Sequence, residues 1–314
     1  MSWTVYWFMF PVCIAIATAA MFSGISGAAL LTPTFLIGFP LFSVPRLGTL
    51  AAIGTSLFLE TSGFGTGLYR YLRARLVDLK TAKSLVLLCL PLGVLGSVAA
   101  SHVPADLLRI GYGIAMLGLA YVLLQDNEKG KRPSDEPTVG PGAAEPAPLI
   151  VSESELAHPR CREGEHRQLR AASGKVYDFC AHGLGLQRAL SGGGAVVAGM
   201  ISTGVGEATL PSLVRRSRFP VPVAAATSTV VVACTVAGAA VTHFVELIQH
   251  GGLSAVPWNL LVFAVPGSIV GAFIGTRLEG RVSEKAARLF FAGLFAAIGV
   301  AFLLAFTVFK HRFA

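Results

Sequence analysis

The stretches SGISGAALLTP at residues 23–33 and STGVGEATLP at residues 202–211 decide the fold of this chain. Each places glycines, hydroxyl side chains and a proline inside a long apolar region. Glycine lets the backbone leave the helical conformation at low steric cost, and proline removes a backbone donor. Irregular backbone survives in a bilayer only where protein or a water-filled cavity covers it. The two stretches therefore predict a pair of broken helices that face a polar interior.

The composition around these stretches is that of a polytopic membrane protein. Of the 314 residues, 54% are hydrophobic and only 13% are charged, and the mean hydropathy is +0.67. Soluble globular proteins average about 25% charged residues, which argues against an ordinary soluble enzyme. A helix needs roughly 20 apolar residues to cross the hydrocarbon, and most of the apolar stretches reach this length. The stretches lie near residues 4–22, 23–42, 47–69, 84–101, 106–124, 189–214, 221–245, 257–278 and 286–309.

The two halves of the chain share one order of features, which predicts an internal duplication. Beyond the two broken stretches, the matching features are VPRLGTLAAIGTS (44–56) with VPVAAATS (221–228), Pro91 and Gly96 with Pro266 and Gly271, and Arg109 with Arg288. Repeats that are interrupted at corresponding positions indicate the substrate site of a secondary transporter. The predicted fold is an all-α polytopic membrane protein with an N-terminal repeat at 1–124 and a C-terminal repeat at 189–314.

The placement of basic residues predicts the orientation of the repeats, because cytoplasmic loops carry an excess of Lys and Arg. Three loops are basic, and three others hold only Arg46 between them. The basic loops are 70–83, 215–218 and 277–288, and the others are 38–46, 101–106 and 245–257. All the basic loops share the cytoplasmic side if 23–42 and 189–214 are re-entrant. The repeats are then inverted, with seven crossings, the N-terminus inside and the C-terminus outside; eight plain crossings with both ends inside are the alternative.

Residues 125–188 form the one polar segment and are predicted to be a cytoplasmic linker. Up to about residue 150 the segment is rich in Pro, Glu, Gly and Ala, which is typical of disorder. KVYDFC at 175–180 predicts a short strand. The spacing of the local His and Cys residues matches no standard zinc pattern, so no metal or other cofactor is predicted. These residues are His158, Cys161, His166, Cys180 and His182.

The broken stretches and the hydroxyls that follow them form the predicted anion site. Unwinding frees backbone N–H groups, and a helix that begins there directs its positive end at the gap. Hydroxyls can donate to the same anion, or they can bond to carbonyls of their own helix. Close helix packing through small residues is the alternative explanation of the glycines. The predicted substrate-binding residues are Ser23, Gly24, Ser26, Gly27, Thr55, Ser56, Thr203, Gly204, Gly206, Thr227 and Ser228.

Glu60 and Glu207 are the two acidic residues that lie deep within apolar stretches. Ionisable residues inside a membrane are rare and usually functional. Glu207 lies within the second broken stretch, so it is the better placed of the two. We predict that this pair couples transport to protons. For Glu60, a structural hydrogen bond to a nearby hydroxyl is the alternative.

These motifs resemble those of the sulfite exporter TauE/SafE family, the 4-toluene sulfonate uptake permease type. The repeated glycine motif of the family, followed by proline, is similar to Gly24–Ala28 with Pro33 and to Gly204–Ala208 with Pro211. Its G-T-S and Y-x-R-x-x-x-V-D motifs are similar to residues 54–56 and 71–78. The resemblance covers about residues 1–124 and 175–309. It departs from the family where Ser26, Ala28, Glu207 and Ala208 replace motif glycines.

The resemblance implies a secondary transporter rather than an enzyme. Its substrate would be a small anion such as sulfite, a sulfonate or a related sulfur compound, moved by alternating access across the cell (inner) membrane. The departures from the motif leave the exact substrate open. The direction of transport, the coupling ion and assembly into a homo-oligomer are also left open. No nucleic-acid partner is expected, because the basic residues form no solvated stripe with aromatics.

Two other classes of function are weaker alternatives. A cation or metal carrier would use Glu60, Glu207, Cys234 and His243. An intramembrane serine hydrolase would use Ser26 of Gly24–Gly27 together with a histidine, His102 or His243. The sequence has no G-x-S-x-G elbow and no H-E-x-x-H motif, which argues against the hydrolase.

Overall fold

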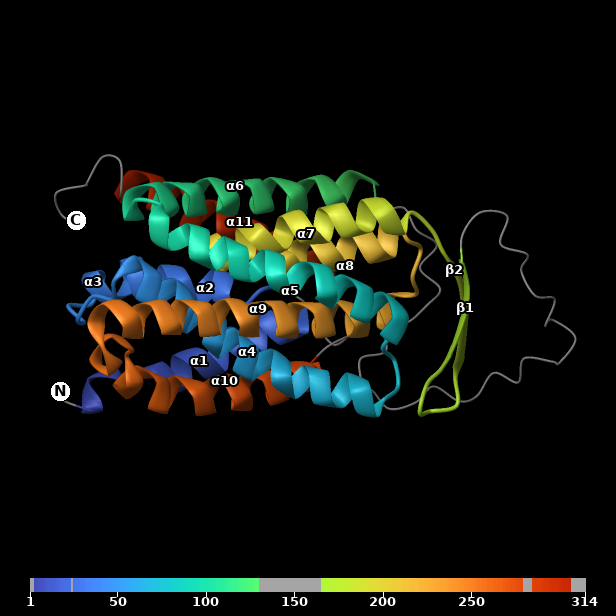
Figure 1. The fold of residues 1–314 in the computed structure, drawn as a ribbon, viewed down its shortest axis with the longest axis horizontal. Coiled ribbons are helices and arrows are strands. Elements are labelled where there is room, and N and C mark those ends of the chain that lie inside the picture. Colours follow the sequence, from blue (N-terminus) through green and yellow to red (C-terminus); the bar gives the residue numbers. More distant parts are fainter. Residues whose placement is uncertain (1–2, 24, 130–164, 279–283, 306–314) are drawn as a thin grey trace, which may run out of the picture.

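The computed structural model describes residues 3–23, 25–129, 165–278 and 284–305, and it is a bundle of helices with one β hairpin at an end (Figure 1). The first half contains η1 (Trp3–Tyr6), α1 (Met9–Ser23), α2 (Ala28–Pro33), the π-helical η2 (Thr34–Gly38), α3 (Phe39–Leu41), α4 (Thr49–Arg73), α5 (Leu79–His102) and α6 (Ala105–Lys129). The second half contains β1 (Glu165–Arg170), β2 (Val176–Ala181), α7 (Leu184–Ile201), α8 (Val205–Arg215), α9 (Val221–Gly251), η4 (Leu253–Ala255), α10 (Trp258–Leu278) and α11 (Glu284–Leu303).

Six helices of the described chain are at least 20 residues long, namely α4, α5, α6, α9, α10 and α11. At 1.5 Å per residue, 20 residues span about 30 Å, the thickness of the hydrocarbon layer. Four of the six, α5, α6, α9 and α10, are also apolar enough along their length to cross a membrane. The prediction of a helical polytopic membrane protein is therefore confirmed.

The remaining long segments form two helical hairpins. Figure 1 shows α2 and α3 returning toward the end of the bundle where α1 begins. In the same way, α8 returns toward the end where α7 begins. Each hairpin therefore enters the bundle and leaves it on one side, and the two enter from opposite ends.

The first hairpin differs from the prediction in its extent. Residues 4–22 were expected to make a full crossing, but α1 has only 15 residues, or about 22 Å, before the backbone leaves the helix. It is the first arm of the hairpin, and its beginning lies at the end opposite the β hairpin (Figure 1). The expectation of seven crossings with the N-terminus on the side of the linker is therefore not confirmed, and the described chain pairs six long helices with two hairpins.

Described residues in or beside each of the three basic loops lie at the end of the bundle that carries the β hairpin. Ala172 N donates to Ala74 O at 2.9 Å, next to the α4–α5 loop, and His182 N donates to Ser217 O at 3.3 Å, in the α8–α9 loop. The side chain of Arg70 in the last turn of α4 donates to Thr276 in the last turn of α10. This arrangement matches the prediction that the basic loops share one side.

The polar segment between the two halves contains more structure than the sequence indicated. The expected strand is β2, which pairs antiparallel with β1 in a register that runs from Glu165 opposite Ala181 to Arg170 opposite Val176. Ala171, in the turn, packs with buried residues of the α4–α5 region, among them Tyr71. The hairpin is therefore attached to the helices and caps their ends.

Glycines bring two pairs of helices into backbone contact. A Cβ atom at Gly271 of α10 would lie 2.5 Å from Ile14 O of α1. A Cβ atom at Gly199 of α7 would lie 2.1 Å from Gly93 O of α5. Because lipid tails are as apolar as the side chains, helices in membranes associate through such close packing. These contacts hold the first arm of each hairpin against a long helix of the other half.

Candidate functional site

Both predicted helix breaks are present, one in each hairpin. The first lies between the end of α1 at Ser23 and the start of α2 at Ala28. The second lies between α7 and α8, where Ser202 has φ +59° and Gly204 has φ +129°. Glycine is favoured at Gly204, because that φ is rarely adopted by other residues and a Cβ would lie 3.1 Å from Gly194 O.

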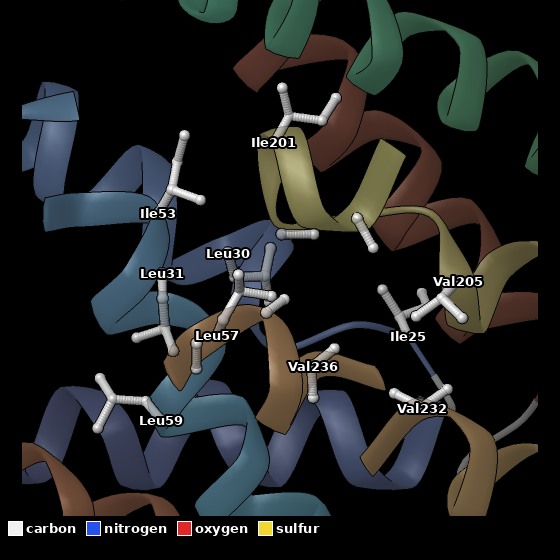
Figure 2. Packing of buried hydrophobic residues seen from close by; sticks show 14 of the residues in the cluster. Ile25, Leu30, Leu31, Ile53, Leu57, Leu59, Ile201, Val205, Val232 and Val236 are labelled. Atoms are coloured by element: carbon white, nitrogen blue, oxygen red, sulfur yellow. The ribbon is translucent and has the colours of Figure 1, made fainter. Parts of the chain in front are cut away.

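The two breaks meet inside the bundle, joined by the side chain of Glu207. Its Oε1 accepts a hydrogen bond from Ser26 N at 3.2 Å, and its Oε2 accepts one from Gly204 N at 3.0 Å. Figure 2 shows Ile25 of the first break beside Val205 at the start of α8. From this point α2 and α8 run toward opposite ends of the bundle (Figure 1). The N-termini of the two short helices therefore face each other across one carboxylate.

A second carboxylate, that of Glu60 on α4, occupies the N-terminus of α2. Glu60 is 4% exposed, and its Oε1 accepts the Ser26 hydroxyl at 2.5 Å. The first N–H groups of a helix have no partner within the helix. Glu207 and Glu60 together accept the N–H and the hydroxyl of Ser26, just before the start of α2.

A cluster of hydroxyls continues the site along α2. Thr32 Oγ1 lies 2.9 Å from Ser56 Oγ of α4 and 2.6 Å from Ser202 Oγ of the second break. Ser56 in turn donates to Ala52 O in its own helix. The hydroxyl oxygens of Thr55 and Thr203 are buried and have no hydrogen-bond partner among the described residues. The cluster offers donors that an oxygen-rich ligand can use.

Three contributors to this site were missing from the sequence prediction. Thr32 and Ser202 link the two breaks, and Tyr112 of α6 donates from its hydroxyl to Ala29 O at 2.7 Å. Thr32 immediately precedes the motif proline, and Ser202 opens the second broken stretch, so both had a signal in the sequence. Tyr112 had none, because its role depends on how α6 packs against α2.

The remaining predicted residues have different surroundings. Thr227 Oγ1 accepts the backbone N–H of Asp78 at 3.1 Å, immediately before α5, and Ser228 beside it is buried in α9. Gly206 lies within the first turn of α8, and a Cβ there would meet only Val232 at an ordinary 3.6 Å. Gly24 lies outside the described residues, as does the side chain of Ser23.

The contacts do not assemble the machinery of the two alternative functions. The Ser26 hydroxyl donates to Glu60, whereas His243 Nε2 is hydrogen-bonded to Gly199 O at 2.8 Å, so no Ser–His pair forms between them. Among the described residues, no three His, Cys, Asp or Glu side chains are close enough to hold a metal ion.

Four of the five candidate metal ligands of the linker are bonded to other residues or lie outside the described chain. His166 Nε2 lies 2.6 Å from Asp178 Oδ1, and Cys180 is disulfide-bonded. His158 and Cys161 lie outside the described residues.

A comparison with known families finds one that covers nearly the whole chain. The family model described as sulfite exporter TauE/SafE matches residues 9–302, a range that includes both hairpins and both breaks. No curated protein and no solved structure gives a match.

Proposed function

Because the chain belongs to the sulfite exporter TauE/SafE family, whose members are membrane transporters of sulfite or related anions, we propose that it carries a sulfur oxyanion, sulfite or a sulfonate, by alternating access. One observation carries the proposal: the N-termini of α2 and α8 meet inside the bundle and bind carboxylate oxygens there. The oxygens of a sulfite or sulfonate group accept hydrogen bonds in the same way.

The packing of the helices supports two inverted repeats, α1–α6 and α7–α11. If α1 corresponds to α7, α2 to α8, α4 to α9, α5 to α10 and α6 to α11, contacts in one half have counterparts in the other. The contact of α1 with α10 then corresponds to that of α7 with α5, and the contact of α2 with α4 to that of α8 with α9. Because the hairpins enter from opposite ends, the proposed topology has six crossings and two re-entrant hairpins.

The basic loops support a cytoplasmic location for the β-hairpin end. Cytoplasmic loops are enriched in Lys and Arg, and all three basic loops of this chain lie at that end. The opposite end, with η1, would then face the outside of an inner membrane.

The two carboxylates suggest how transport of the anion is coupled to protons. Glu207 already accepts the N–H groups of Ser26 and Gly204, and Glu60 accepts the Ser26 hydroxyl, so an oxyanion that uses these donors must displace at least one carboxylate. A displaced carboxylate beside a bound anion would be repelled by it unless a proton neutralises the carboxylate. Protonation would therefore release the backbone N–H groups and remove a repelling charge in one step. On this basis the anion moves together with at least one proton.

Flux into reconstituted vesicles tests the transported substrate. Purified protein in proteoliposomes is given radiolabelled sulfite, a labelled sulfonate or a divalent metal ion, with and without a pH gradient. We expect sulfite or sulfonate to accumulate, and to do so faster with an inward proton gradient. Flux of the metal without flux of either sulfur anion would overturn the proposal.

Glu207→Gln tests the coupling, because it keeps the size of the side chain and removes the titratable group. We expect the variant to lose the dependence of flux on the pH gradient. Glu246→Gln, the same change on α9, serves as the matched control and is expected to keep it. Unchanged flux and unchanged pH dependence in Glu207→Gln would dismiss its role in coupling.

A further inference from the structure

A second polar pocket lies at the β-hairpin end of the bundle, between the first turns of α5 and α7 and strand β1. Its volume is about 170 Å³, and its polar lining includes Lys80, Thr81, Glu165, Arg167, Gln187 and Arg188. A water molecule occupies roughly 30 Å³ in the liquid, so the pocket has room for a four-oxygen anion.

The pocket is separate from the central site. Gln187 lies seven residues before Gly194, the residue of α7 that packs against Gly204, which places the two about 10 Å apart along the helix. Neither Glu60 nor Glu207 lines the pocket.

Positive charge exceeds negative charge around the pocket. Lys80, Arg167 and Arg188 line it together with a single carboxylate, that of Glu165. Lys80 Nζ and Arg167 Nη2 both bind Glu165, and Arg167 Nη1 binds Asp78 at 2.6 and 2.8 Å. Against these three positive side chains stand two carboxylates, Glu165 and Asp78, so one positive charge remains. Arg188 is exposed, so the pocket can take a charged ligand from solution.

Three buried polar groups of the lining lack partners among the described residues. They are the hydroxyl of Thr81, which is 4% exposed, Nε of Arg167 and Oε1 of Gln187, which is 0% exposed. Buried polar groups are almost always hydrogen-bonded in proteins, so three around one cavity indicate a ligand. Thr81 and Arg167 are donors. A half-turn of the Gln187 amide would make it a third donor, with its oxygen accepting from Ser191.

The helices add two further sources of positive potential. Both α5, with 24 residues, and α7, with 18 residues, begin beside the pocket, at Leu79 and Leu184. Their first backbone N–H groups and dipoles favour a negative ligand. We propose that this pocket binds a phosphate- or sulfate-type oxyanion, either free in solution or as the headgroup of an anionic lipid. Thr81, Arg167 and Gln187 would hold it, and Lys80 and Arg188 would attract it.

Equilibrium binding of labelled sulfate and phosphate tests the site. The full chain is placed in nanodiscs of zwitterionic lipid, and the dissociation constant is measured for wild type, Thr81→Val and Arg188→Gln. Thr81→Val removes one hydrogen bond and Arg188→Gln removes one exposed charge, and each should raise the dissociation constant about 3- to 10-fold. The double variant should raise the dissociation constant about 10-fold or more. Arg216→Gln removes an equally exposed charge at the same end and should leave binding unchanged. Since Arg188 is exposed, its variant remains informative if Thr81→Val does not fold.

A second arm distinguishes a lipid headgroup from a free anion. Thermal stability is compared in nanodiscs with and without phosphatidylglycerol. A stabilisation by the anionic lipid that the double variant loses and Arg216→Gln keeps identifies the headgroup as the ligand. The proposal is overturned if wild type and the double variant bind sulfate and phosphate with equal dissociation constants and are stabilised equally by the anionic lipid. Because no step of transport is involved, failure here leaves the sulfite flux experiment untouched, and the reverse also holds.

Discussion

At the scale of single residues, Glu207 is the side chain that joins the two helix breaks. A glycine in its place would leave the N–H groups of Ser26 and Gly204 without the carboxylate that now binds both. We therefore expect Glu207→Gly to bind sulfite more tightly, because substrate no longer competes with a tethered anion. The Michaelis constant of sulfite flux should fall, and its dependence on external pH should weaken. A higher Michaelis constant in this variant would argue that Glu207 assists binding instead.

Ser26 connects the two carboxylates, because its N–H binds Glu207 and its hydroxyl binds Glu60. Ser26→Ala removes the hydroxyl alone and leaves a buried carboxylate short of one donor. The expected loss of stability is about 1–3 kcal/mol, measured by thermal unfolding in detergent. Ser254→Ala, at an exposed site in η4, is the control and should change stability by less than about 0.5 kcal/mol. Equal losses of stability in the two variants would show that the hydroxyl of Ser26 stabilises the protein no more than an exposed hydroxyl does.

At the scale of elements, α7 provides a matched pair of glycines. A Cβ at Gly199 would press against the backbone of α5, whereas a Cβ at Gly193 meets nothing within 4 Å. Gly199→Ala should therefore destabilise the protein by about 1–3 kcal/mol through overpacking. Gly193→Ala should be neutral or stabilising by up to about 1 kcal/mol, because alanine favours the helix. Thermal unfolding of both variants decides the point, and a milder effect at Gly199 would mean that α5 and α7 separate easily.

The β hairpin supplies a prediction about pH. Lys80 and Arg167 bind the carboxylate of Glu165 and hold its pKa below the ordinary value. A lowered pKa in the folded state stabilises the hairpin above the unfolded pKa, about 4.3, and this contribution is lost as pH falls through the folded pKa. We expect wild type to melt at a higher temperature than Glu165→Gln at pH 7, and the difference to vanish in acid. A difference independent of pH would exclude these ion pairs as its source.

The sequence predicted the elements unevenly, for physical reasons. Glycine and proline density located both breaks, because irregular backbone inside a membrane needs such residues. The same density did not reveal that α1 ends after 15 residues, since apolar composition is the same in a short helix and in a long one. Glu60 and Glu207 stood out as intramembrane acids, whereas the contact of Tyr112 with Ala29 O depended on the packing of α6, which no local pattern encodes.

At the scale of the whole molecule, the proposed arrangement of six crossings and two re-entrant hairpins predicts a definite topology. In a cysteine-free background, a single cysteine at Ser173 in the β-hairpin turn should react with a membrane-impermeant thiol reagent only after the cells are permeabilised. One at Ser254, between α9 and α10, should react in intact cells. Seven crossings with the N-terminus inside would place Ser173 and Ser254 on the same sides as six crossings do, so a further cysteine at Thr4 in η1 separates the two topologies. It should react in intact cells if there are six crossings, and only after permeabilisation if there are seven. If the cysteines introduced at Ser173 and at Ser254 reacted from the same side of the membrane, the result would contradict the arrangement.

The carboxylates that fill the two helix ends have a consequence for the unloaded carrier. A transporter whose central backbone N–H groups have no partner reorients slowly without substrate, because these groups would be buried away from water without a hydrogen bond. Such a carrier works by swapping one solute for another. In this chain the carboxylates of Glu60 and Glu207 occupy the place of the substrate, so reorientation of the empty transporter meets no such obstacle. The expected behaviour is net one-way movement down the combined gradients, with no requirement for a counter-substrate on the far side.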